Sequence, residues 1–457
     1  MAYTKPSAFQ HNQFVILLGV LHVIFIVIFG LFARYSESAQ PSGVANQEMS
    51  DFPLFEDIHG MIFIGFGFLM TFLRRYGFSA ISINLFLATF VIEWAIIIRG
   101  FLSEEFHEHG IFSIGIKNMI TADFAAAVIL ITMGGLLGKL SPSQYLIMAF
   151  LETPVALVTE HIIVEVLHVS DVGGSLVVHL FGAVFAFGVA KVLNRSGIAR
   201  SDHEGSIVHS DLFAMVGSLI LFIYWPSFNA AVAVGDNAKQ RCILNTYLSL
   251  SGAVLGTFIT SQLVNHKRHF DMVHMANAIL AGGVAIGSVA NISLHPVLAL
   301  IIGTFSGIIS VMCINWLTPF MKNKLGIHDT CSINSLHGVP AFISGICSVI
   351  LALVYTKEQF GAEYAYIYPA SVGDHPRSNT DQALYQALAI LIAIVVPSVA
   401  GLVTGVILKL KIWNQVADEE LFADGAYFHC PNDYDFTTKT ISHIDHIEIT
   451  EEVKIAA

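Results

Sequence analysis

The chain has 457 residues, of which 55% are hydrophobic and only 12% are charged, and its net charge is -12. A soluble domain carries about 25% charged residues, so this composition excludes a soluble protein and indicates one that crosses a membrane many times. The acidic balance and the lack of a basic stripe argue against nucleic-acid binding. The five cysteines are scattered along the chain, so we expect no metal site and no cofactor from them.

Apolar runs between polar breaks predict twelve membrane-spanning helices of about 20 residues each. The first run covers about residues 14–32 and no small-residue cleavage site follows it, so we expect it to remain as a helix. The spans centre near residues 23, 66, 90, 127, 153, 183, 222, 253, 281, 307, 344 and 397. The fold class is therefore an all-α polytopic membrane protein. Its organisation is an N-terminus with a first helix (1–33), a loop (34–54), a membrane domain (55–410) and a polar tail (411–457).

The orientation follows from the basic residues, because Lys and Arg concentrate in cytoplasmic loops. With the N-terminus inside, the cytoplasmic breaks contain Arg74, Arg75, Lys139, Arg195, Arg200, Lys267, Arg268, Lys322, Lys324 and Lys411. The opposite breaks carry acidic clusters, such as Glu104 and Glu105. An even number of spans also places the tail inside. We therefore predict a multi-pass plasma-membrane protein with both termini in the cytoplasm and an extracellular loop at 34–54.

Two stretches share one spacing: "DVGGSLVVH" at 171–179 and "DTCSINSLH" at 329–337. The first opens the sixth span and the second opens the eleventh. If the first span is an addition, these are the fifth helices of two five-helix halves, followed by one final helix. Five is odd, so the halves insert in opposite orientations, and such inverted repeats have their site near the bilayer midplane.

The depth of the two histidines fits this arrangement. Eight residues of helix rise about 12 Å, and the middle of the hydrocarbon core lies about 15 Å from either face. His179 and His337 would therefore meet near the middle from opposite sides. Asp171 and Asp329 do not share a helix face with the rings, so we expect them to cap the two helices and support the site.

A histidine inside a membrane is a functional hypothesis by default, although a ring bonded to a neighbouring helix is the structural alternative. Two histidines at matching depth favour function. A desolvated imidazole stays neutral and offers one donor and one acceptor. Two bonded rings thus form a polar rail that suits a small neutral molecule such as ammonia, whereas no carboxylate ring or carbonyl filter for ions is visible.

At these residues the sequence resembles the Rhesus (Rh) glycoprotein branch of the ammonium transporter family. The matching stretches are "FEDIHGMIFIGFGFLMTFLRRYGFSA", "ITADF", "LSPSQYLIM", "DVGGSLVVHLFGA", "SDLFAMVGSLILFIYWPSFNAA", "DMVHMANAILAGGVAIG" and "DTCSINSLHGVP". The resemblance implies a channel domain over 55–410 and a homotrimer with one pore in each subunit. It implies that His179 and His337 are the twin pore histidines, and that Phe124 and Phe228 stack to close the outer mouth.

Physically, such an aromatic pair would exclude water and hydrated ions, and it could hold ammonium briefly by cation–π attraction. The bacterial-type branch has a tryptophan at its outer recruitment site. The fifth span, 144–164, has none, which favours the Rh branch and weaker capture of ammonium. One departure is that the predicted loop at 34–51 lacks the N-glycosylation sequon usual in Rh glycoproteins.

Other polar residues near these motifs are weaker candidates. Glu160 could enrich ammonium at the outer vestibule, or be an ordinary interfacial carboxylate. Asp123 could orient the helix of Phe124 or cap it, and Asn229 could present a polar group below the gate. Three more lie in matching stretches and could line the inner mouth, although helix capping is the favoured interpretation for both aspartates: Asp211, Asp271 and Asn277.

The sequence thus predicts that ammonium loses its proton at the outer vestibule, ammonia crosses the pore, and the proton is regained on leaving. Carbon dioxide or another small gas as cargo, and electrogenic ammonium transport, remain open alternatives. A non-conducting membrane scaffold is a remote one. No nucleophile–base set is visible, so we do not expect an enzyme. The expected partners are membrane lipid and further copies of the chain, and the pattern identifies no cytoskeletal or other partner for the tail.

Overall fold

The computed structural model describes residues 8–41, 47–201, 203–293 and 295–430. Within these ranges, twelve helical segments are long and apolar enough to cross a membrane, which confirms the predicted number of spans. The spans are Phe9–Phe32, Met49–Phe72, Gly77–Leu102, Ile116–Leu136, Pro142–Val166, Ser175–Leu193, Val208–Ala230, Asp236–Val264, Met272–Val289, Pro296–Leu325, Asn334–Val354 and Asn379–Leu408. The part of the predicted tail beyond residue 430 lies outside the described residues.

Some spans are single helices and others combine shorter ones. The helices are α1 (Ala8–Phe32), α2 (Phe52–Gly60), α3 (Phe66–Leu69), α4 (Gly77–Leu102), α5 (Glu104–His109), α6 (Ile116–Leu136), α7 (Pro142–His161), α8 (Phe181–Leu193), α9 (Ser196–Arg200), α10 (Val208–Ala230), α11 (Asp236–Val264), α12 (Met272–Ala278), α13 (Ala281–Ile286), α14 (Pro296–Met312), α15 (Thr318–Phe320), α16 (Val339–Val354), α17 (Lys357–Phe360), α18 (Tyr364–Ile367) and α19 (Asn379–Leu408). Two short strands, β1 (Ala33–Tyr35) and β2 (Phe112–Ile114), pair in parallel.

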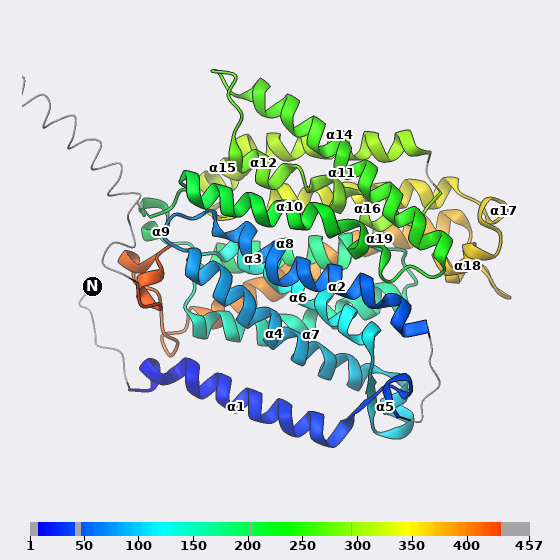
Figure 1. Cartoon of the computed structure of the whole chain (residues 1–457), viewed down its shortest axis with the longest axis horizontal. Coiled ribbons are helices and arrows are strands. Elements are labelled where there is room, and N and C mark those ends of the chain that lie inside the picture. Colours follow the sequence, from blue (N-terminus) through cyan, green and yellow to red (C-terminus); the bar gives the residue numbers. More distant parts are fainter. Residues whose placement is uncertain (1–7, 42–46, 202, 294, 431–457) are drawn as a thin grey trace, which may run out of the picture.

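The long helices run across the molecule in a similar direction (Figure 1). The loop helices α5, α17 and α18 lie at one end, whereas α9 and the segment that follows α19 lie at the other (Figure 1). We call the first end outer and the second inner, following the predicted orientation. The spans form an N-terminal extra helix, two five-helix halves of opposite orientation, and the final helix α19.

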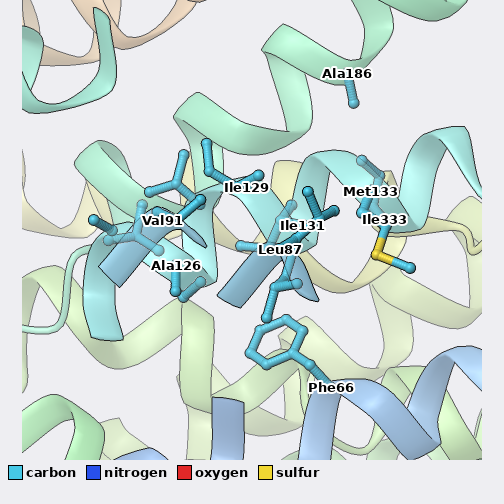
Figure 2. Packing of buried hydrophobic residues seen from close by; sticks show 14 of the residues in the cluster. Phe66, Leu87, Val91, Ala126, Ile129, Ile131, Met133, Ala186 and Ile333 are labelled. Atoms are coloured by element: carbon cyan, nitrogen blue, oxygen red, sulfur yellow. The ribbon is translucent and has the colours of Figure 1, made fainter. Parts of the chain in front are cut away.

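The spans differ widely in burial, and α1 and α6 illustrate the range. In the most apolar window of each span, 6% of the α1 residues and 89% of the α6 residues are buried. The more apolar of the two is α1, so apolar composition alone does not place a helix in the interior of a bundle, because lipid also accepts an apolar surface. Figure 2 shows Ala126, Ile129 and Ile131 of α6 among Leu87 and Phe66 from other spans. α1 lies along one edge of the bundle (Figure 1).

Lipid provides no hydrophobic force that drives helices together, so close packing has to stabilise the bundle. Small residues at the helix contacts permit this close approach. At Gly303 of α14, an added Cβ would lie 1.8 Å from the carbonyl oxygen of Ser249 on α11. At Gly217 of α10, it would lie 2.1 Å from the backbone nitrogen of Leu69. Any larger side chain would force these pairs of helices apart.

Two segments expected to be loop or tail are partly folded. The second span begins at Met49, inside the segment 34–54. At the inner end, Phe422 is fully buried and its N–H donates to the carbonyl of Gly138. The carboxylate of Asp424 accepts from the N–H groups of Phe78 and Ser79 and thereby caps α4. The beginning of the tail therefore packs against the inner ends of the spans.

Candidate functional site

The two histidines of the repeated motif lie side by side in the interior. Their Nδ1 atoms are 3.1 Å apart, within hydrogen-bond distance. The ring centroids are 5.1 Å apart and the ring planes are nearly parallel, at 11°. Both side chains are buried, with 1% exposure for His179 and 2% for His337. The two halves of the chain therefore bring together the pair that the sequence predicts.

Aromatic rings continue this pair in both directions. On the outer side, Phe228 lies 5.7 Å from His179 and 4.3 Å from Phe124, measured between ring centroids. On the other side, Phe66 stacks on His337 at 6.2 Å and 11°. The five rings form one row, which we call the ring row, and the predicted gate pair is its outer end.

The sequence predicts regular α-helices that begin at Asp171 and Asp329. The helices that carry the two histidines begin later and are irregular. The helical part begins only at Ser175 in one half and at Asn334 in the other, and both first segments are π-helical: Ser175–Leu180 and Asn334–Gly338. Gly174 adopts a left-handed conformation, with φ of 64°, at the start of the first. Each histidine thus lies within one turn of its helix start, and π-helical turns occur frequently at functional sites.

Asp171 and Asp329 cap the two helices as expected, although each aspartate lies in the loop before its helix and not at the position next to the helix start. Asp171 accepts from the N–H groups of Leu176 and Val177, at 2.9 and 3.0 Å. Asp329 accepts from Ile333 and Asn334, at 3.0 and 2.9 Å. These bonds satisfy N–H groups that have no partner within the first turn of a helix. They therefore fix the orientation of the two short segments that hold the rings.

One nitrogen of the histidine pair has no partner. The Nε2 atom of His179 is buried, and the described part of the chain provides no hydrogen bond to it. A buried polar atom without a partner costs free energy, so this nitrogen marks a position where a ligand or water can bind. Trp225 stacks against the same ring at 5.6 Å and covers it. Sequence reasoning missed Trp225, although it precedes Phe228 by one helical turn in "WPSFN".

An outer cavity of about 550 Å³ leads to Phe124 and is also lined by Val177, Glu160 and Arg99. Glu160 lies at this vestibule as predicted, but an oxygen of its carboxylate is 2.6 Å from a guanidinium nitrogen of Arg99. The arginine offsets much of the negative field, because the two charges form a close pair. No local sequence pattern predicts this partner, and its positive charge opposes the enrichment of a cation by Glu160.

The inner end is much narrower. A cavity of about 20 Å³, enough for one or two water-sized molecules, is lined by Asp211 and Asn277 among others. Asp211 lies in the first turn of α10 and receives a bond from the hydroxyl of Ser206, so the favoured capping interpretation is not observed for it. Asp271 is the N-cap of α12 and accepts from the N–H of Val273, as expected for a capping aspartate.

Asn229 and Asp123 each adjoin a gate phenylalanine, and the buried Oδ1 atom of Asn229 has no hydrogen-bond partner among the described residues. The amide nitrogen of Asn229 donates to Thr246 and to the carbonyl of Gly283, so this group braces α10 against neighbouring helices. Asp123 is fully buried inside α6, whose N-cap is Gly115, and therefore is not a cap. Its carboxylate is instead 3.0 Å from the Nδ1 atom of His59.

A second polar cluster, near the inner end, was also missed. Lys139 is buried and its ammonium group donates to the carbonyls of Gly135 and His328. The other side of the His328 ring contacts Glu204 at 2.9 Å, and Lys322 contacts the same carboxylate. Burial alone would raise the pKa of Glu204, but the bonds and charges of His328 and Lys322 lower it to about 2. A separate buried acid, Glu152 in the span Pro142–Val166, accepts a hydrogen bond from the hydroxyl of Thr132 and is not part of this cluster.

The fold and site together define a helical membrane protein with a buried row of aromatic and imidazole rings that begins at an outer vestibule, and with a narrow cavity near its inner end. The profile of the Ammonium Transporter Family matches residues 14–427, and the chain belongs to this family.

The relatives confirm the branch that the motifs indicate. Ammonium transporter Rh type B of Xenopus tropicalis is 42% identical over 426 residues, which cover 90% of this chain and 92% of that protein. Ammonium transporter Rh type C of Homo sapiens is 40% identical over 427 residues, covering 90% and 88%. The solved structure of Nitrosomonas europaea Rh50, a protein of the Rhesus family of channels, matches with a TM-score of 0.70 at 30% identity and covers 89% of this chain and 99% of that one.

Proposed function

We propose that this chain is a channel that conducts ammonia through the ring row, with His179 and His337 as its polar rail and Phe124 and Phe228 as its outer gate. The observation that carries the proposal is the bonded histidine pair with an unpartnered Nε2 on His179. Membership in a family of transporters supports transport rather than catalysis. Ammonium loses its proton at the vestibule, ammonia crosses, and the proton is regained at the inner mouth.

The chemistry of the pair explains why a neutral molecule fits. A bond between two Nδ1 atoms of neutral rings requires that one carries the hydrogen and the other accepts it. The ring that donates through Nδ1 then has an accepting Nε2, whereas the other ring has a donating Nε2. Ammonia both donates and accepts, so it can bind at either end of the pair. An ion would lose its hydration shell without gaining a counter-charge there.

The proposal extends to assembly and location. Three copies form a homotrimer in the plasma membrane, with both termini in the cytoplasm and one ring row in each copy. Large apolar side chains are exposed along α10, among them Leu212, Val216, Leu219 and Ile223, and they fit burial by a neighbouring copy or by lipid. Cross-linking of the purified protein in detergent tests the trimer.

Stopped-flow uptake of ammonia by vesicles containing the purified protein tests the function. We expect His179→Leu and His337→Leu each to lower ammonia permeability about tenfold or more, because the loss of a buried hydrogen-bonding partner costs about 1–3 kcal/mol. His274→Leu is the matched control, since this buried histidine bonds to Ser261 and Asn315 instead. Wild-type rates in both pore variants would refute the rail.

Two parallel measurements on the same vesicles separate the alternatives. A current that scales with ammonium flux would indicate electrogenic transport in place of ammonia conduction. Carbon dioxide uptake that depends on His179 and His337 would add that gas as a cargo. No transport of any of these substrates by wild-type protein would indicate a scaffold.

A further inference from the structure

The residue before each gate phenylalanine bonds to the same third helix. Asp123 precedes Phe124 on α6, and its carboxylate lies 3.0 Å from Nδ1 of His59. Ser227 precedes Phe228 on α10, and its hydroxyl donates to Asp57 at 2.5 Å. Asp57 and His59 are two residues apart on α2. The two gate helices are therefore tied to one short segment at the level of the gate.

We propose that Asp57 and His59 are positioning residues that set the spacing of the outer gate and thereby its size selectivity. We call the two bonds, Asp123–His59 and Ser227–Asp57, the gate brace. This inference rests on the proposed function for its selectivity consequence, but not for its effect on ring spacing. The brace touches neither the histidine pair nor the path itself, so it acts only through Phe124 and Phe228.

The His59 side of the brace is held in place by its surroundings. The imidazole lies between Phe55 and Phe63, one turn before and one turn after it, with ring centroids 4.9 and 4.5 Å away. Asp123 is fully buried, whereas the His59 side chain is 39% exposed. A buried carboxylate without a partner costs several kcal/mol, so Asp123 holds the His59 ring strongly.

The Ser227 side of the brace lies where α10 is locally weakened. Pro226 is inside the helix, directly before Ser227, and it removes one backbone hydrogen bond. Further along, α10 and the second span are in direct contact, since a Cβ added at Gly65 would lie 2.7 Å from the Leu221 side chain. The bond to Asp57 therefore fixes the part of α10 next to Phe228 that the proline leaves free to move.

The geometry gives the brace a specific consequence. The two gate rings are 4.3 Å apart between centroids, in van der Waals contact. A small outward shift of either helix would open the contact and admit larger molecules. The brace therefore keeps the gate narrow, so that molecules larger than ammonia pass less readily than they would through a widened gate.

Four variants test the brace in the full-length protein. His59→Leu and Ser227→Ala each remove one bond. His59→Gln retains an amide N–H that can donate to Asp123, so it should restore wild-type behaviour. Ser251→Ala is the control for a helix serine, because the hydroxyl of Ser251 donates to the carbonyl of Tyr247 within its own helix.

Two measurements are made on each variant: the ratio of methylammonium to ammonia permeability in vesicles, and the separation of the Phe124 and Phe228 rings by electron cryomicroscopy. We expect His59→Leu and Ser227→Ala to raise the ratio severalfold and to separate the rings, while His59→Gln and Ser251→Ala match wild type. An unchanged ratio and ring separation in folded Ser227→Ala and His59→Leu would overturn the brace.

The two measurements also separate this inference from the proposed function. Wild-type protein that transports no ammonia would refute the function, yet the ring separations would still decide the brace. If His59→Leu does not fold, Ser227→Ala against Ser251→Ala decides it. A ratio that rises equally in His59→Gln and His59→Leu would overturn the role of the bond, since packing of the imidazole would then explain the effect.

Discussion

The two halves of the molecule use the same local motif in different electrostatic surroundings. In the first half, Asp171 caps the segment of His179 and its remaining oxygen accepts from the hydroxyl of Ser288, a neutral group. In the second, Asp329 caps the segment of His337 and lies near the ammonium group of Lys139. Burial raises the pKa of Asp171 to about 6, and it raises the pKa of Asp329 while the charge of Lys139 partly opposes the increase.

The difference teaches that capping and charge compensation are separate tasks. Both aspartates supply acceptors to the first N–H groups of a short helix, and this is sufficient to orient a histidine. Only Asp329 has a buried cation nearby, namely Lys139 of the first half, which clusters with His328, Glu204 and Lys322. Asp171 lies at the wide vestibule but is itself buried, and its two oxygens accept hydrogen bonds from neutral groups without a counter-charge.

The largest expected effect comes from removing the caps. Asp171→Ala removes three accepted bonds and Asp329→Ala removes two. We expect free-energy losses of about 3–6 kcal/mol for Asp171→Ala and about 2–4 kcal/mol for Asp329→Ala, at roughly 1–2 kcal/mol per bond to a carboxylate. Thermal unfolding in detergent measures both. A larger loss for Asp329→Ala than for Asp171→Ala would show that the contribution of Asp329 comes mainly from the charge of Lys139 and not from capping.

A smaller effect concerns the acid range. The pKa of Asp171 is raised in the folded protein, so between about pH 4 and pH 6 the unfolded state releases this proton first and stability falls as pH rises. The contribution is about 3 kcal/mol over two pH units. Asp171→Asn keeps one acceptor and should remove this part of the pH dependence. If the free energy of unfolding depended on pH in the same way for wild type and Asp171→Asn between pH 4 and pH 7, the assignment would be contradicted.

A further pH effect is expected in the alkaline range and belongs to the cluster around Lys139. Burial lowers the pKa of Lys139, so the unfolded state binds more protons above neutral pH and stability rises with pH there. The slope is at most about 1.4 kcal/mol per pH unit. Lys139→Met should abolish it, while Lys191→Met, at an exposed lysine of α8, should not. A slope retained in Lys139→Met would exclude this group as its source.

The sequence by itself determined the class, the number of spans, the inverted halves and the identity of the histidine pair. Those features follow from local rules, since hydropathy sets the spans and a repeated spacing places His179 and His337 at matching depths. The family motifs added Phe124 and Phe228, which composition alone could not distinguish among 34 phenylalanines.

Tertiary structure alone decided the contacts between distant segments. The partners Arg99–Glu160, His59–Asp123 and Lys139–His328 are separated by 61, 64 and 189 residues, and no local pattern connects them. The late helix starts at Ser175 and Asn334 also escaped prediction, because a capping aspartate several residues upstream and a residue with positive φ, Gly174 or Ser332, replace the expected first turn. Burial is the physical reason: inside a bundle each polar group must find a partner wherever the packing brings one, and sequence distance does not enter that requirement.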